Sequence, residues 1–427
     1  MKKDEYRKTR LLYIIEAAIE YFISLMTTGT YVALLASHLG MSDDLTGIMT
    51  SLTSLGCAFQ LFSLFLSKKS SVKRAVVLLH SINQAAFALM YFVPFVDLPE
   101  QFKITFFIIL LLAAHALHNG VQPAKINWYM SLVEDKRRGS FTANKEIVSL
   151  VSGACFSFGM GAIVDYLKES GRVELSFTLC GITLFSLTVL HSLTLLLSRE
   201  MSAERGDGIK VLKTAKKLLS DKGFAKILVL SGLWNIAFYG VTPFYASYTI
   251  KELGFSLIFI SVQNAITAIS RVICSRPLGR YADRTSFSRM LNVCYLAALA
   301  AFAVNIFTVP SNAKILYTVY SVLFAVAMAG INSAEVNLVY DYVSREDASC
   351  AIAIKNAIVG FIGFISTVAV SRLVRLIQED GNRFLGIKVY AQQVTSFLGA
   401  VILLIIIVYL NTVVKTGKRT RADKSTA

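Results

Sequence analysis

The sequence predicts an all-α integral membrane protein with twelve transmembrane helices, arranged as two pseudo-symmetric six-helix bundles. Its composition is 55% hydrophobic and only 16% charged, whereas soluble domains are about 25% charged. Apolar runs long enough to cross a bilayer, about 20 residues each, recur along the chain. The second half also repeats features of the first, which indicates two related bundles.

The twelve expected spans follow one another with short polar connections. They are 11–38, 44–66, 74–95, 103–131, 142–166, 175–198, 223–250, 256–276, 288–309, 314–341, 349–374 and 391–413. An even number of spans places both termini on the same side of the membrane.

The distribution of basic residues predicts which side that is. Of the 43 lysines and arginines, 32 lie in the two termini and the even-to-odd connections with their adjoining span ends, and 9 lie at the opposite connections. Lys125 and Arg271 lie within spans. Because basic loops stay in the cytoplasm, we expect both termini to be cytoplasmic. We therefore attribute the net charge of +16 to the basic cytoplasmic connections of a membrane protein. No nucleic-acid partner is expected.

A long cytoplasmic link at 199–222 divides the chain into two expected bundles, 1–198 and 223–427, the second ending in a short basic tail. From Lys210 to Leu219 the link resembles an amphipathic helix at the membrane interface. The segment 127–153 aligns without gaps on 337–363. Identities include Asn127 with Asn337, Lys145 with Lys355 and Gly153 with Gly363. Matched identities at equivalent points of both halves indicate an internal repeat.

A basic segment between the eighth and ninth spans carries the pattern Gly-x-x-x-Asp-Arg-x-x-x-x-Arg, from Gly279 through Asp283 and Arg284 to Arg289. We expect it to form a turn whose glycine permits close backbone approach and whose aspartate accepts hydrogen bonds from a helix N-terminus or an arginine. The pattern resembles the cytoplasmic signature of the major facilitator superfamily (MFS). Arg138-Gly139 after the fourth span also resembles a loop of that family, and the resemblance covers nearly the whole chain.

Some features depart from the family's pattern. The connection 67–74 keeps the basic charge but lacks the glycine and aspartate. The fourth span has no arginine at its middle, where proton-driven members often carry one. The fifth span has glycines but no Gly-Pro pair, which marks the drug antiporters of the family. These absences weigh against drug–proton antiport.

The resemblance implies that spans 1, 4, 7 and 10 line a central cavity, and the polar residues of the chain fall on these spans. Ionisable groups inside a bilayer are costly and tend to face a cavity or a partner. The predicted substrate-binding or cavity residues are Glu20, His115, His118, Asn119, Gln122, Trp234, Asn235, Tyr239, Asn332 and Glu335.

Glu20 and Glu335 are the sharpest candidates. Burial favours the neutral form of a carboxyl group, which brings its proton exchange toward neutral pH. We therefore expect one of them to couple proton movement to transport or to bind a cationic group of the substrate. The alternative is a structural carboxylate bonded to neighbouring polar groups. Glu16, nearer the cytoplasmic end, is expected to pair with a basic loop residue.

The histidines and aromatic residues of these spans allow several interpretations. His115 and His118 share one helix face, where a hydrogen bond to substrate, a proton relay or packing between helices are all open. No third ligand lies nearby in sequence, and no metal site is predicted. Trp234 and Tyr239 suit sugar rings or organic cations or simple packing.

A cytoplasmic gate is the second predicted site. The resemblance implies that charged groups at the cytoplasmic helix ends hold one transport state closed. The candidates are Gly279, Asp283, Arg284, Arg138, Lys145 and Lys355. The alternative is ordinary surface charge, which contributes little at each pair.

We interpret the chain as a secondary active transporter for a small polar organic solute, working by alternating access. A proton is favoured over sodium as the coupling ion. A multidrug or metabolite efflux carrier, or a non-transporting protein on the same fold, are the alternatives. No enzymatic motif is present, so no enzyme activity and no cofactor are expected. We expect a multi-pass monomer in the lipid bilayer of the cell membrane.

Overall fold

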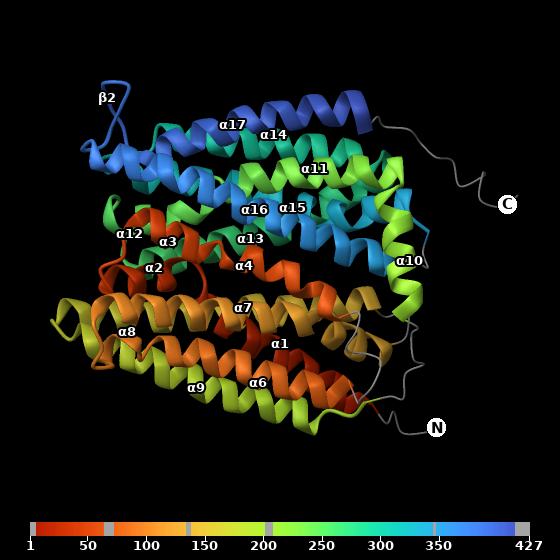
Figure 1. Ribbon diagram of the computed structural model, residues 1–427, viewed down its shortest axis with the longest axis horizontal. Helices are drawn as coiled ribbons and strands as arrows, with labels where there is room; N and C mark the ends of the chain where they lie inside the picture. The colour runs from red at the N-terminus through yellow and green to blue at the C-terminus, as the bar shows by residue number, and fades with distance from the viewer. Residues whose placement is uncertain (1–5, 64–71, 134–137, 201–207, 345–346, 415–427) are drawn as a thin grey trace, which may run out of the picture. The chain divides into compact units, whose positions relative to one another are not determined.

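The computed structural model describes residues 6–63, 72–133, 138–200, 208–344 and 347–414. Almost all of them are helical (Figure 1). By their contacts the residues form two compact units. Unit 1 comprises Met1–Gly208 and Pro243–Val262, and unit 2 comprises Ile209–Thr242 and Gln263–Ala427. Each unit is described by itself.

Unit 1 contains the helices of the first six expected spans. They are α1 (Arg7–Thr27), α2 (Gly29–His38), α3 (Asp43–Thr50), α4 (Leu52–Gly56), η1 (Cys57–Phe62), α6 (Val72–Met90), η2 (Val93–Phe95), α7 (Glu100–Ser131), α8 (Arg138–Glu169) and α9 (Val173–Leu197). In this bundle α6 packs against α7 and α9, and α1 packs against α8 and α9. The first span is broken between α1 and α2, where Thr28 is extended and Gly29 has a φ of 55°, a conformation that glycine adopts readily.

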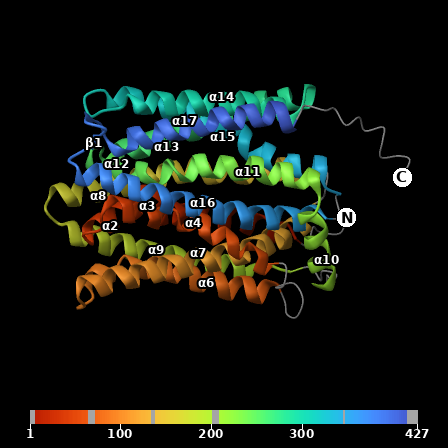
Figure 2. The ribbon, with the colours of Figure 1, turned by 45° about the horizontal axis from the view of Figure 1, so that its top comes forward.

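Unit 2 contains the later helices except the segment Pro243–Val262, which comprises most of η4, all of α12 and the first turns of α13 and belongs to unit 1. The elements of the second half of the chain are α10 (Gly208–Leu219), α11 (Lys222–Tyr239), η4 (Thr242–Phe244), α12 (Tyr245–Lys251), α13 (Leu257–Arg284), α14 (Phe287–Ile306), α15 (Ala313–Tyr342), α16 (Ala348–Glu379), β1 (Arg383–Phe384), β2 (Ile387–Lys388), α17 (Ala391–Tyr409) and η5 (Leu410–Val414). The helix α14 packs against α15 and α17, and α11 packs against α16 and α17 (Figure 2). The strands β1 and β2 form a small antiparallel hairpin.

Eleven of the described helical segments are long and apolar enough to cross a membrane. The remaining expected span, 74–95, corresponds to α6. This helix has the right length, but it buries His80, Asn83 and Gln84, and these polar side chains lower its mean hydropathy. The polarity of α6 therefore reflects what it packs against inside unit 1.

The expected turn at Gly279 is wrong. The helix α13 continues through Gly279 and Asp283 to Arg284, and the next helix, α14, begins at Phe287 with Ser286 as its cap. No heavy atom lies within 4 Å of the position that a Cβ would take at Gly279, so this glycine is not needed for close packing among the described residues. The basic composition suggested a loop, but a helix end tolerates arginines well because its dipole attracts cations.

The amphipathic helix expected at 210–219 is present as α10, which crosses the ends of the unit 2 helices (Figure 1). Lys217 on α10 contacts Asp347 just before α16, with Nζ and Oδ2 3.0 Å apart. The hydrogen bond from Lys217 lowers the pKa of Asp347. This surface pair joins α10 to the start of α16 within unit 2.

Close helix packing in unit 2 depends on a glycine. A Cβ at Gly330 of α15 would lie 2.3 Å from the Sγ of Cys294 on α14, well inside van der Waals contact. We expect Gly330→Ala to destabilise the protein by about 1–3 kcal/mol, the usual effect of overpacking. Thermal unfolding in detergent measures this loss. The double variant with Cys294→Ala should recover most of it, and equal stability of all three proteins would contradict the packing.

Candidate functional site

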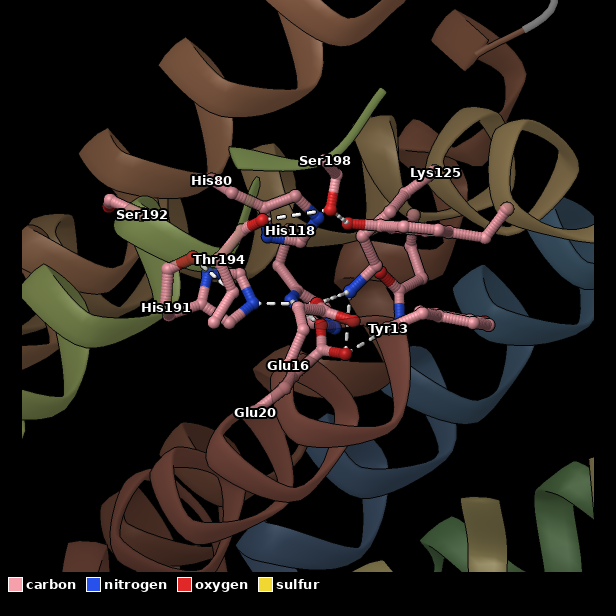
Figure 3. A network of polar contacts seen from close by, with 12 residues as sticks. Tyr13, Glu16, Glu20, His80, His118, Lys125, His191, Ser192, Thr194 and Ser198 are labelled. Carbon is pink, nitrogen blue, oxygen red and sulfur yellow. Dashed lines mark hydrogen bonds and ion pairs between the residues drawn. The ribbon is translucent and has the colours of Figure 1, made fainter. Parts of the chain in front are cut away.

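A buried ionic cluster lies between helices of unit 1 (Figure 3). The Lys125 Nζ atom on α7 is 2.7 Å from Oε1 of Glu16 and 2.6 Å from Oε2 of Glu20, both on α1. The two carboxylates are one helical turn apart and so face the same partner. The side chains of Lys125 and Glu16 are 1% and 0% exposed. A lysine inside a membrane span requires such partners, and here it receives two.

Three histidines surround this cluster from neighbouring helices. The Nε2 atom of His191 on α9 lies 2.7 Å from Oε1 of Glu16. The Nδ1 atom of His118 on α7 lies 3.8 Å from Oε1 of Glu20. His80 on α6 lies edge-on to His118, with ring centroids 5.6 Å apart. The cluster thus joins α1, α6, α7 and α9, and its direct ionic contacts involve two carboxylates and one ammonium group.

Aromatic residues cover one side of the cluster. The rings of Tyr13 and Tyr129 are stacked with centroids 4.1 Å apart, and Tyr129 donates a hydrogen bond to Oγ of Ser198. Lys145 of α8 lies over the Tyr13 ring, with its Nζ atom 3.4 Å from the tyrosine oxygen. Lys145, predicted as a gate residue, therefore lies at the edge of this cluster.

Access to the cluster is uneven. The Glu16 side chain is fully buried, whereas Glu20 is 17% and His118 is 28% exposed. Among the described residues, the second oxygens of Glu16 and Glu20 and the Oε1 atom of Gln122 make no hydrogen bond. Glu20 and His118 are thus the partly exposed members of the cluster.

The other predicted residues of α7 have packing contacts. The His115 ring lies edge-on to Phe87 of α6, with centroids 5.0 Å apart. The Asn119 side chain donates to the carbonyl of His115 at 3.0 Å and accepts from Gln60. Neither side chain has a hydrogen bond or ion pair with Lys125 in the described part of the chain.

Unit 2 contains a second carboxylate–lysine pair. Nζ of Lys355 on α16 lies 2.8 Å from Oε2 of Glu335 on α15. The lysine side chain is 3% exposed and the glutamate 17%. The sequence placed Lys355 at the start of a helix in the cytoplasmic charge network. In the structure α16 begins at Ala348, so Lys355 lies inside the helix and pairs with Glu335.

The remaining candidates of unit 2 have varied surroundings. Trp234 is 5% exposed and packs against Phe238 and Tyr295. Asn235 donates to the carbonyl of Ser231, Tyr239 packs edge-on against Phe238, and Asn332 is exposed. Asp283 and Arg284 are exposed at the end of α13. The Arg138 side chain lies outside the described residues.

Sequence reasoning missed four members of the cluster, which are Glu16, Lys125, His80 and His191. Glu16 was expected to pair with a basic loop residue, and this was wrong, because its partners are Lys125 and His191 within the membrane spans. Lys125 itself was the available signal, since a lysine inside a span requires a carboxylate nearby. His80 lies on the least apolar span and gave no comparable signal.

Glu20, His80 and His191 each have a donor atom within 4.8 Å of the others, which is a spacing that a metal ion can use. However, Oε2 of Glu20 already contacts Lys125, and Nε2 of His191 contacts Glu16. We therefore assign these residues to the ionic cluster and not to a metal centre.

The family model of the Major Facilitator Superfamily matches residues 17–367. The chain therefore belongs to this superfamily of membrane transporters, and the twelve-helix fold expected from the sequence is confirmed. No curated protein matches the chain at a significant level.

Several solved structures with the same fold are distant in sequence. A mutant of the nucleoside transporter NupG has a TM-score of 0.73 and 14% identity, with 94% of this chain and 98% of that chain covered. A bacterial homologue of the human lysosomal transporter Spinster has a TM-score of 0.69, 14% identity and coverages of 97% and 98%. A D-xylose-proton symporter has a TM-score of 0.69, 10% identity and coverages of 93% and 96%. Family and fold indicate a multi-pass secondary transporter and not an enzyme.

Removing the lysine tests the energetics of the cluster. Lys125→Met leaves two buried carboxylates without their cation, and breaking a buried ion pair in this way costs about 3–5 kcal/mol. Thermal unfolding in detergent should show a large loss of stability. Adding Glu20→Gln should restore part of it, because one uncompensated charge is removed. A double variant less stable than Lys125→Met alone would contradict the arrangement.

Proposed function

We propose that the protein is a proton-coupled secondary transporter that moves a small polar organic solute across the cell membrane by alternating access. The observation that carries this proposal is the buried cluster in which Glu16 and Glu20 share the single ammonium group of Lys125. When the histidines are neutral, Glu16, Glu20 and Lys125 together carry one more negative than positive charge. An uncompensated charge is costly in a membrane interior, so the cluster favours one additional cation.

The donor atoms around the cluster favour a proton over sodium. Hard metal cations prefer several oxygen ligands, whereas His80, His118 and His191 bring imidazole nitrogens. The groups that face Glu20 are Glu16 on its own helix, His80 on α6, His118 and Lys125 on α7, His191 on α9 and, beyond Tyr13, Lys145 on α8. We assign proton exchange to Glu20, because it is the carboxylate of this cluster that is partly exposed.

The solute is expected to offer several hydrogen-bond donors. Within the described part of the chain, Oε1 of Glu20, Gln122 and Glu335 are buried acceptors that receive no hydrogen bond, and the nearby lysines 125 and 355 are buried behind carboxylates. An anionic solute would meet the excess negative charge of the cluster in unit 1. The related structures include proteins named for nucleosides and D-xylose, and such polar solutes fit this pattern of acceptors.

We also propose that both termini lie on the cytoplasmic side of the membrane. The excess of lysine and arginine at the termini and the even-to-odd connections supports cytoplasmic termini. The connections 39–42, 170–172 and 252–256 then face the outside. Asp283, Arg284 and Arg138 remain candidates for a cytoplasmic gate.

Reconstitution into proteoliposomes tests the proposal. Uridine, D-xylose and dialanine would first be screened by thermal stabilisation, since a ligand of the folded form raises the melting temperature. Uptake of a stabilising solute should then exceed equilibrium when the outside is acidic. One pH unit supports up to about tenfold accumulation at one proton per solute.

Glu20→Gln should abolish this pH-driven accumulation while leaving solute exchange at equal pH. The matched control is Glu174→Gln, which changes an exposed carboxylate at the start of α9 and should behave like the wild type. Full pH-driven accumulation in Glu20→Gln would exclude this residue as the coupling group.

A further inference from the structure

One segment of unit 1 comes from the second half of the sequence. Pro243–Val262 contains most of η4, all of α12 and the first turns of α13, and it connects the seventh and eighth spans. Its contacts place it with the first six spans, and α12 packs against α2 and α3 (Figure 1). Two buried carboxylates of the first half hold this segment.

Asp43 forms the first of these attachments. It is the first residue of α3 and is 6% exposed. Its Oδ1 atom accepts hydrogen bonds from Oγ of Ser247 and Nζ of Lys251, both at 2.5 Å. Both donors belong to α12, and the contact with Lys251 is an ion pair. Charge-assisted bonds of this kind are about twice as strong as neutral ones.

Asp165 forms the second attachment at the start of α13. It lies near the end of α8, is 8% exposed, and accepts the backbone N–H groups of Leu257 and Ile258 at 3.1 and 2.8 Å. The first N–H groups of a helix have no partner within it, and the helix dipole favours an anion there. A side chain of the first half thus supplies the N-terminal cap of a second-half span.

Close packing follows the same line along α8 and α13. The hydroxyl oxygens of Ser157 and Ser261 are 2.9 Å apart. A Cβ at Gly161 would lie 3.1 Å from the carbonyl oxygen of Leu257, so glycine permits this approach. On α3, a Cβ at Gly47 would overlap the ring of Phe244. The segment is therefore fitted to the first half over several turns.

We propose that Asp43 and Asp165 are positioning residues of the transport cycle, which clamp the 243–262 segment to the first half on the outer face and release it when the carrier opens outward. This inference rests on the proposed alternating access and orientation, because a rocking motion of the two halves must separate second-half residues from first-half residues on one face. The two carboxylates set how often that separation occurs.

A cysteine at position 261 reports the separation without a transport assay. Ser261 is 4% exposed, so Ser261→Cys should react slowly with a membrane-impermeant maleimide. Adding Asp43→Asn and Asp165→Asn should raise the labelling rate of this residue at least about tenfold, because weakened charge-assisted bonds shift the opening equilibrium by that order. Mass spectrometry of the peptide containing residue 261 separates it from native cysteines. Glu174→Gln is the control and should leave the rate unchanged.

An unchanged labelling rate in the folded Asp43→Asn/Asp165→Asn protein would overturn the proposal. A second test leaves both carboxylates in place, in case that variant does not fold. The 2.9 Å separation of the Ser157 and Ser261 hydroxyls suits a disulfide between Ser157→Cys and Ser261→Cys. Oxidation should stop solute uptake, and reduction should restore it.

The two proposals fail in distinguishable ways. Uptake that continues in the fully crosslinked protein would refute the clamp while leaving the transport function intact. A wild type without uptake of any probe would refute the proposed transport of such solutes, and the labelling rates would still decide whether Asp43 and Asp165 hold the segment.

Discussion

The ion pairs of Lys125 are the interaction on which the architecture of unit 1 depends. One ammonium group lies 2.7 and 2.6 Å from two carboxylates of α1, and Glu16 in turn contacts His191 of α9. Removing Lys125 alone would leave both carboxylates without a counter-charge in a medium of low dielectric. The same constraint that fixes the helices relative to one another also provides a site whose charge an additional proton can balance.

The internal repeat gives this arrangement a counterpart in unit 2. The offset that aligns Asn127 with Asn337 also places Lys125 opposite Glu335 and Lys145 opposite Lys355. The charge at the equivalent position of the fourth and tenth spans is therefore reversed. Lys125 is paired by carboxylates of α1, whereas Glu335 is paired by Lys355 of α16. The two halves share a scaffold and a buried ion pair, but the pairs use different helices. Among the residues that the structure describes, two carboxylates meet one lysine in unit 1, whereas one carboxylate meets one lysine in unit 2.

Much of the fold could be predicted from the sequence, because apolar run length and basic-residue distribution are local properties. The spans and the link helix α10 followed from them, and the family was predicted from its resemblance to the pattern between Gly279 and Arg289. The site was predicted in part: Glu20, His118 and Gln122 were expected to share a region and do lie together. The partners of Glu16 were not predicted, because they lie on helices that are distant in sequence from α1. The turn at Gly279 was misjudged because an arginine-rich helix end and a basic loop have the same composition, and hydrogen bonding alone distinguishes them.

The measurement that tests the central claim most directly is infrared difference spectroscopy between acidic and neutral pH on the reconstituted protein. It requires no knowledge of the solute. The account predicts a protonated-carboxyl band that appears on acidification in the wild type and in Glu174→Gln, and that is lost in Glu20→Gln. A band that persists unchanged in Glu20→Gln, or a wild type in which no buried carboxyl takes up a proton, would contradict the assignment of the coupling site to the cluster around Lys125.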